Sequence, residues 1–192
     1  MDRADLSGGD ARQISADEAL YLAVLARRTD RETLEAWAWR MLELGSDSPS
    51  LAALTSARGM VVGSELDLLV EAAIAETGLP TLPAEDDAEY RAALLPILLD
   101  WQAGRRSARE AFDAIRAARA PGPDTGVEFQ GLAEDLDLMR ALSGTADWSA
   151  FEEEFASVAT ELLAKCSPIL TDFVPRVKQA LSRLASISRG VP

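Results

Sequence analysis

The stretch TDRETLEAWAWRMLELGSDSPSLAAL, residues 29–54, carries the clearest structural pattern in the chain. Thr29 and Glu32 have the spacing of a capping box, which predicts the start of a helix. Gly45 has the position of a helix end, and Ser48 with Pro49 is expected to start the next helix. Between these signals, apolar residues recur at the spacing of one buried helical face: Leu34, Trp37, Ala38, Met41 and Leu44. The two tryptophans make this helical hairpin the expected seed of the core.

Similar signals continue along the rest of the chain. Ser15 with Glu18 and Ser107 with Glu110 form two more capping boxes. No segment alternates polar and apolar residues as a strand does. The sequence therefore predicts an all-α fold, a compact bundle of about nine helices. Their expected ranges are 15–28, 29–45, 49–57, 64–78, 84–103, 107–119, 132–144, 147–165 and 167–188.

Composition and turn signals suggest how the chain is divided. Residues 1–14 contain two adjacent glycines and alternating charges, which predicts a flexible N-terminal arm. Residues 120–126, APGPDTG, are the best candidate for an internal boundary. Residues 15–120 are then a helical core with the tryptophan-bearing hairpin, and residues 127–192 are C-terminal helices packed on the same domain. Residues 79–83, LPTLP, are expected to be a short extended linker, because their prolines disfavour a helix.

In two expected helices, the apolar pattern indicates which side chains are buried and which could be exposed. The helix over residues 29–45 places Trp39 about 140° around its axis from Leu34, with Leu42 beside it. Trp39 and Leu42 are therefore either buried on a second side of this helix or exposed as a patch for a partner. Burial is favoured, because large exposed aromatic side chains are uncommon on soluble proteins. The helix over residues 64–78 is expected to bury one apolar stripe: Leu66, Leu69, Val70, Ala73 and Ile74.

Charge and hydropathy exclude several classes of function. The chain has 32 acidic and 19 basic residues, and its formal net charge is -13. Such a charge repels phosphate backbones, so direct nucleic-acid binding is disfavoured, and it attracts a basic partner. No apolar run is long enough to cross a membrane, and the first residues lack the apolar centre of a secretory signal. We therefore expect a cytoplasmic protein, and the single cysteine agrees with a reducing compartment.

One residue type that serves several common catalytic mechanisms is missing from the chain. The chain contains no histidine, which removes Ser-His-Asp and Cys-His catalysis and the usual zinc sites. Cys166 precedes an expected helix start, where a thiol can become nucleophilic, but free cysteines more often fill a turn as small apolar residues. Acidic clusters at 85–89, 134–137 and 152–154 could bind magnesium. The first and third lie in expected first helical turns, where negative charge usually offsets the helix dipole, and the cluster at 134–137 is expected on the solvated face of a helix. No catalytic residue, metal site or cofactor is predicted.

Part of the chain resembles a group of known sequences. Trp37, the Leu44-Gly45 pair and residues 47–54 resemble a pattern in small, uncharacterised all-helical bacterial proteins, where a tryptophan-bearing helix runs into a Gly-x-Asp-Ser-x-x-Leu turn. Residues 101–115 resemble their second feature, a helix, a glycine turn and a further helix. Some of these proteins are similar to immunity proteins of bacterial toxin systems. The resemblance covers about a third of the chain and implies a helical fold without transferring a catalytic residue.

These observations favour a non-catalytic, protein-binding module of a bacterium, either a toxin-neutralising (immunity) protein or an accessory protein. Its acidic surface is expected to meet a basic partner protein. Two alternatives stay open: a helical enzyme or small-molecule binder with a pocket near Tyr90 and Trp101, and an acidic mimic of nucleic acid. The residues expected to contact the partner are Trp39, Leu42, Glu85, Asp86, Asp87, Glu89, Glu152, Glu153 and Glu154.

Overall fold

The computed structural model describes residues 14–26, 30–56, 63–85, 88–117 and 148–189. Within these ranges the chain forms eight α-helices and one π-helical segment and contains no strand, which confirms the predicted all-α fold. The elements are α1 (Ala16–Leu25), α2 (Arg31–Glu43), α3 (Pro49–Ser56), α4 (Ser64–Thr77), α5 (Ala88–Gln102), α6 (Ala108–Ala117), α8 (Trp148–Lys165), η2 (Ile169–Phe173) and α9 (Val174–Arg189). Residues 1–13 of the arm expected over 1–14, the loop at 120–126 and the helix at 132–144 lie outside the described residues. Ile14, the last residue of that expected arm, is partly buried against the core.

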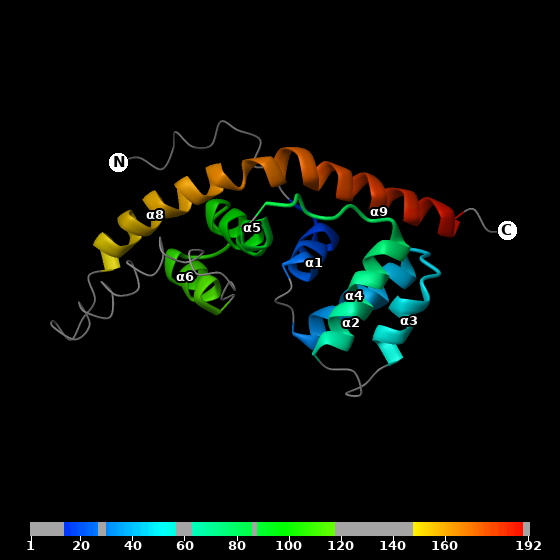
Figure 1. The fold of residues 1–192 in the computed structure, drawn as a ribbon. Coiled ribbons are helices and arrows are strands. Elements are labelled where there is room, and N and C mark those ends of the chain that lie inside the picture. The colour runs from blue at the N-terminus through cyan, green and yellow to red at the C-terminus, as the bar shows by residue number, and fades with distance from the viewer. Residues whose placement is uncertain (1–13, 27–29, 57–62, 86–87, 118–147, 190–192) are drawn as a thin grey trace.

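The helices form two groups beneath one long helical rod. Segments α8, η2 and α9 follow one another in a single arch that runs across the molecule (Figure 1). Helices α5 and α6 pack under α8 at one end of the arch, and α2, α3 and α4 lie together at the other end (Figure 1). Helix α1 packs against α2, α5 and α9, so it joins the two groups into one core.

The arch corrects one expectation from the sequence. A new helix was expected at Ser167, with Cys166 in a preceding turn, but helical hydrogen bonding continues through this point. The Cys166 amide donates to the Leu162 carbonyl at 2.9 Å, and the Cys166 carbonyl accepts from the Leu170 amide at 3.1 Å. The residues after Pro168 form the widened π-helical segment η2, and such wide turns are a common way for a helix to accommodate an interruption. The Cys166 side chain itself is fully buried.

Local capping signals set several of the helix starts. In two of the three predicted capping boxes, at Ser15 and at Ser107, the serine hydroxyl accepts from the amide three residues later at 3.2 Å. The glutamates in turn accept from the serine amides at 2.8 Å. Helix α2 differs from the prediction, because Asp30 caps it and its carboxylate accepts from the Thr33 amide at 2.8 Å. Thr29 lies outside the described residues.

Two aromatic groups anchor the core. Trp37, fully buried on α2, stacks on Tyr21 of α1 with ring centroids 6.1 Å apart. Under α8, Trp101 and Phe155 meet edge to face with ring centroids 5.5 Å apart, and Phe112 and Phe151 do so with centroids 5.3 Å apart. The face of α2 that carries Trp37 is buried as predicted, so the hairpin of residues 29–54 does contribute to the core.

Candidate functional site: an acidic groove beside α4

Helix α4 is covered on one side more than on the other. Among the described helices it packs mainly against α3. Of the stripe that the sequence predicts to be buried, only Ala73 and Ile74 are buried, whereas Leu66, Leu69 and Val70 are partly exposed. The prediction of a fully buried stripe is therefore wrong, because the described elements supply no second helix in extensive contact with α4.

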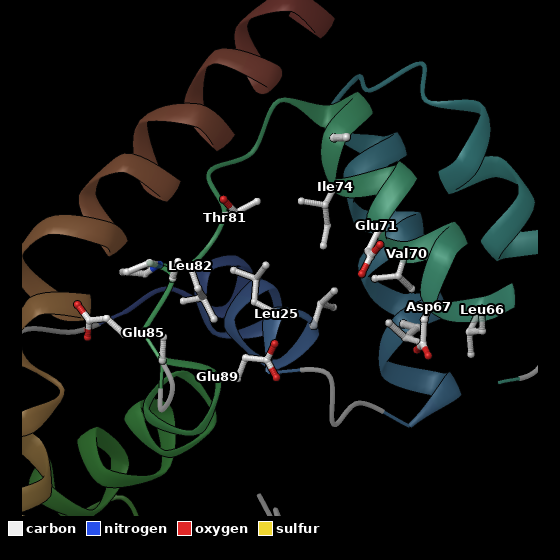
Figure 2. Close-up of a pocket in the computed structure, with 16 residues that line it drawn as sticks. Leu25, Leu66, Asp67, Val70, Glu71, Ile74, Thr81, Leu82, Glu85 and Glu89 are labelled. Carbon is white, nitrogen blue, oxygen red and sulfur yellow. The ribbon is translucent and has the colours of Figure 1, made fainter. Parts of the chain in front are cut away.

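A groove lies along this incompletely covered side. Its volume is about 660 Å³, and it runs between α4, α1 and the residues 81–85 that lead into α5. Figure 2 shows Ile74 and Val70 on the α4 side, Leu82 on the side of the linker, and Leu25 of α1 between them. Leu34 of α2 also contributes to the lining. The floor of the groove is thus apolar and is contributed by α1, α2, α4 and the linker.

The linker wall is held by a buried tyrosine. Residues 79–83 are not helical, as predicted from their prolines. The Tyr21 hydroxyl, on the fully buried ring in α1, donates to the Pro80 carbonyl at 2.9 Å. Burial also raises the pKa of Tyr21 above its ordinary value, so the phenol stays protonated as the donor. This bond connects segments 59 residues apart and fixes the linker against α1.

Four carboxylates line the groove. Asp67 and Glu71 are four residues apart on α4, so they lie one turn apart on the same side of the helix. Glu89, in the first turn of α5, lies across the groove from Glu71, and Glu85 is at the outer end of the linker (Figure 2). No lysine or arginine is among the described residues that line it. The site therefore combines an apolar floor with negative charge on both walls.

Glu85 also has a structural role at the edge of the groove. It forms an ion pair with Arg91, whose side chain is only 12% exposed. Arg91 also donates to the Lys165 carbonyl at 3.1 Å, and the Cys166 thiol donates to the Arg91 carbonyl at 3.7 Å. These contacts connect the start of α5 to the junction of α8 and η2. Part of the charge of Glu85 is therefore neutralised within the chain.

The structure brings together only part of the predicted partner-binding set. Glu85 and Glu89 both line the groove, and Asp86 and Asp87 between them lie outside the described residues. Glu152, Glu153 and Glu154 are exposed on α8 and do not line the groove.

Sequence reasoning missed two of the residues that line the groove, Asp67 and Glu71. The sequence does contain a signal for these two residues: Asp67 and Glu71 are four residues apart, and each directly follows an apolar residue of the same helix, Leu66 or Val70.

The two apolar residues that were expected to contact the partner, Trp39 and Leu42, differ in their exposure to solvent. Trp39 is 56% exposed, so the expectation that it is buried is wrong, and Leu42 is partly buried against the core. Helix α2 buries the face that packs on α1 and α3, and Trp39 lies away from that face. The next residue, Arg40, is held by two hydrogen bonds to Asp17 of 2.8 and 3.0 Å. Neither Trp39 nor Leu42 lines the groove.

The pocket expected near Tyr90 and Trp101 is not the groove. Both side chains are partly buried and pack against the core, and neither is a lining residue. Within the described residues, no group of three or more cysteine, aspartate or glutamate side chains is placed to hold a metal ion. The described helices likewise include none whose length and apolar character would let it span a membrane.

Comparison of the chain with protein-family models, with curated proteins and with solved structures found no match.

Proposed function

We propose that this protein is a non-catalytic binding module whose acidic groove takes a basic segment of another protein. The observation that carries the proposal is the position of the carboxylates, which flank an apolar surface that α4 leaves incompletely covered. Burial of that apolar surface would supply affinity, and the carboxylates would select a basic partner and accelerate its approach. The net charge of -13 also attracts a basic partner at longer range.

Within this proposal, the favoured partner is a bacterial toxin with a basic surface. The resemblance of residues 37–54 to immunity-like helical proteins supports this choice over other basic proteins. An accessory role, in which the module binds a basic protein without inhibiting it, uses the same groove and the same charge pattern. The two roles differ in whether binding suppresses an activity of the partner.

A small-molecule ligand is a second candidate, favoured by the size of the groove. A volume of about 660 Å³ falls within the range of ligand pockets, roughly 300 to 1,000 Å³. Such pockets usually place a few polar groups deep inside to orient the ligand. Here Thr81 is the only uncharged polar side chain among the described lining residues, and it is exposed. The lining therefore fits a broad apolar and basic surface better than a small polar ligand.

The test compares two charge reversals of equal size. D67K/E71K changes the groove, and E152K/E153K changes the exposed surface of α8, so both variants shift the net charge by the same amount. Affinity capture with each variant identifies proteins that the wild type binds, and their dissociation constants are then measured with purified components. We expect a basic partner that the E152K/E153K variant retains and the D67K/E71K variant loses. A partner retained equally by both variants would contradict the proposed site.

A further inference from the structure

We infer that one flank of the arch formed by α8, η2 and α9 is a dimer interface, on which two copies of this chain lie side by side and antiparallel. The inference is independent of the proposed function, because none of the described residues that line the groove belongs to the arch. It follows from the order of the charges along that flank.

Six charged residues lie on the same flank of the arch. Each of them directly precedes a residue that is buried in the core or packed against it, so each lies about 100° around the helix axis from the buried face, always in the same direction. The buried face continues through η2 by way of Ile169 and Phe173, which keeps the flank continuous from α8 into α9 (Figure 1). All six residues are exposed: Glu154, Glu161, Lys165, Asp172, Arg176 and Arg183.

The charges on this flank are arranged symmetrically about the bond between Pro168 and Ile169, with opposite signs on the two sides. Every acidic residue has a basic counterpart at the same number of residues from that bond, and every basic residue has an acidic one. The pairs are Glu154 with Arg183, 14 residues from the bond on either side, Glu161 with Arg176, seven residues from it, and Lys165 with Asp172, three residues from it.

This order makes the flank complementary to itself in one orientation. When a second copy lies antiparallel, with a two-fold axis at the Pro168–Ile169 bond, each charge faces its counterpart of opposite sign. A parallel copy in the same register would place like charges opposite each other. A two-fold contact uses the same surface on both copies and closes on itself, so the expected assembly is a dimer. An unrelated acidic or basic protein would match only one end of the flank.

Most of these charges are available to a second copy. Among the described residues, Glu154, Asp172, Arg176 and Arg183 have no ion-pair partner. Glu161 and Lys165 pair with each other at 3.2 Å, with side chains 67% and 44% exposed. Such an exposed pair contributes little by itself, so both residues can also interact with charges of the second copy.

Apolar side chains between the charges add surface for a second copy to cover. Val158 follows Glu154 by four residues, and Ala180 follows Arg176 by four, so each lies one turn along the same flank. Both are only partly buried. Because the charges remain near solvent, we expect the dimer to weaken as salt is added.

Sedimentation equilibrium of the full chain tests the inference. We expect the wild type to dimerise at low ionic strength, with a dissociation constant that rises about tenfold between 0.02 and 0.5 M salt. A wild type that stays monomeric at low salt, at every concentration up to about 1 mM, would overturn the inference.

Charge reversals locate the interface. We expect E154K/E161K and R176E/R183E each to weaken dimerisation about tenfold or more, because both turn attractive pairs into repulsive ones. In an equal mixture of the two variants, every reversed charge meets a reversed counterpart, so a heterodimer about as stable as the wild-type dimer should form. Circular dichroism checks that each variant folds.

E152K/E153K is the matched control, because it changes the net charge as much as E154K/E161K does. Glu152 directly follows the buried Phe151 and therefore lies on the opposite flank, and Glu153 points away from the core. We expect this variant to keep the dimer. Equal weakening by E152K/E153K and E154K/E161K, or a mixture that does not recover dimerisation, would overturn the inference. Should a reversal not fold, E154Q/E161Q compared with E152Q/E153Q replaces it, with the same expected order.

Discussion

The hydrogen bonds of Ser48 give a quantitative prediction for the junction between α3 and α4. The Ser48 hydroxyl accepts from the Leu51 amide at 3.1 Å in the first turn of α3 and donates to the Glu76 carboxylate near the end of α4. Glu76 also accepts from the Ser50 amide at 3.1 Å and from the Ser50 hydroxyl at 2.8 Å. This cluster attaches α4, one wall of the groove, to the helical hairpin.

We expect S48A to destabilise the protein by about 1 kcal/mol, because it removes the side-chain cap of α3. Ser48 is buried, so water does not easily replace its hydroxyl. For a protein of this size the loss corresponds to a decrease of about 2 to 4 °C in Tm. The assay is equilibrium unfolding in urea, followed by tryptophan fluorescence.

Ser56, at the other end of α3, supplies the matched control. Its exposed hydroxyl donates to the Ala52 carbonyl at 2.8 Å within the same helix and connects to no other element. We expect S56A to change the free energy of unfolding by less than about 0.5 kcal/mol. If S48A and S56A have equal effects, the argument that the Ser48 cluster joins α3 to α4 is refuted.

Three further changes test other parts of the structure. The hydroxyl of Ser48 and then the backbone and side chain of Ser50 lower the pKa of Glu76 by hydrogen bonding. The ionised Glu76 therefore stabilises the fold at neutral pH, and this contribution is lost in acid. The difference in unfolding free energy between wild type and E76Q should shrink below pH about 4.3, and a difference that stays constant with pH would contradict the prediction. F155A removes a fully buried ring, which should cost about 3 to 5 kcal/mol in urea unfolding. W39A should change stability by less than about 0.5 kcal/mol, whereas W37A should cost about 3 to 5 kcal/mol; equal losses would contradict the exposed position of Trp39.

The parts of the fold that the sequence predicted well depend on neighbouring residues. The capping boxes at Ser15 and Ser107 need only contacts three residues apart, and both are present. A glycine at a helix end is likewise a local signal. Gly78, with φ of 64°, ends α4 because it adopts a left-handed conformation. Such signals fix several helix boundaries before any tertiary contact is known.

The predictions that were wrong concern side chains whose burial depends on tertiary contacts. Periodicity places Trp39 and Val70 on faces of their helices, but only the neighbouring helices determine whether those faces are covered. Helix α2 has no described helix over Trp39, and the side of α4 that carries Val70 borders the groove. The expected break near Cys166 failed for a related reason, because that residue is buried against α5 in a continuous helical arch.

The candidate site was predictable only in part. Glu85 and Glu89 form a cluster that is visible in the sequence, and both line the groove. Asp67 and Glu71 reach the same groove from α4, and the linker between these elements is positioned by the bond from Tyr21 to Pro80. A charge pattern along the chain does not reveal such convergence, because a contact between residues 59 apart defines it.

Hydrogen-exchange mass spectrometry of the protein with and without its captured partner is the most direct test of the groove as the binding site. Binding there should slow amide exchange in α4 and in residues 79–85, and should leave the exposed first turns of α8 unchanged. Protection confined to α8 around Glu152 to Glu154, or to α2 around Trp39, with no change in α4, would contradict the account.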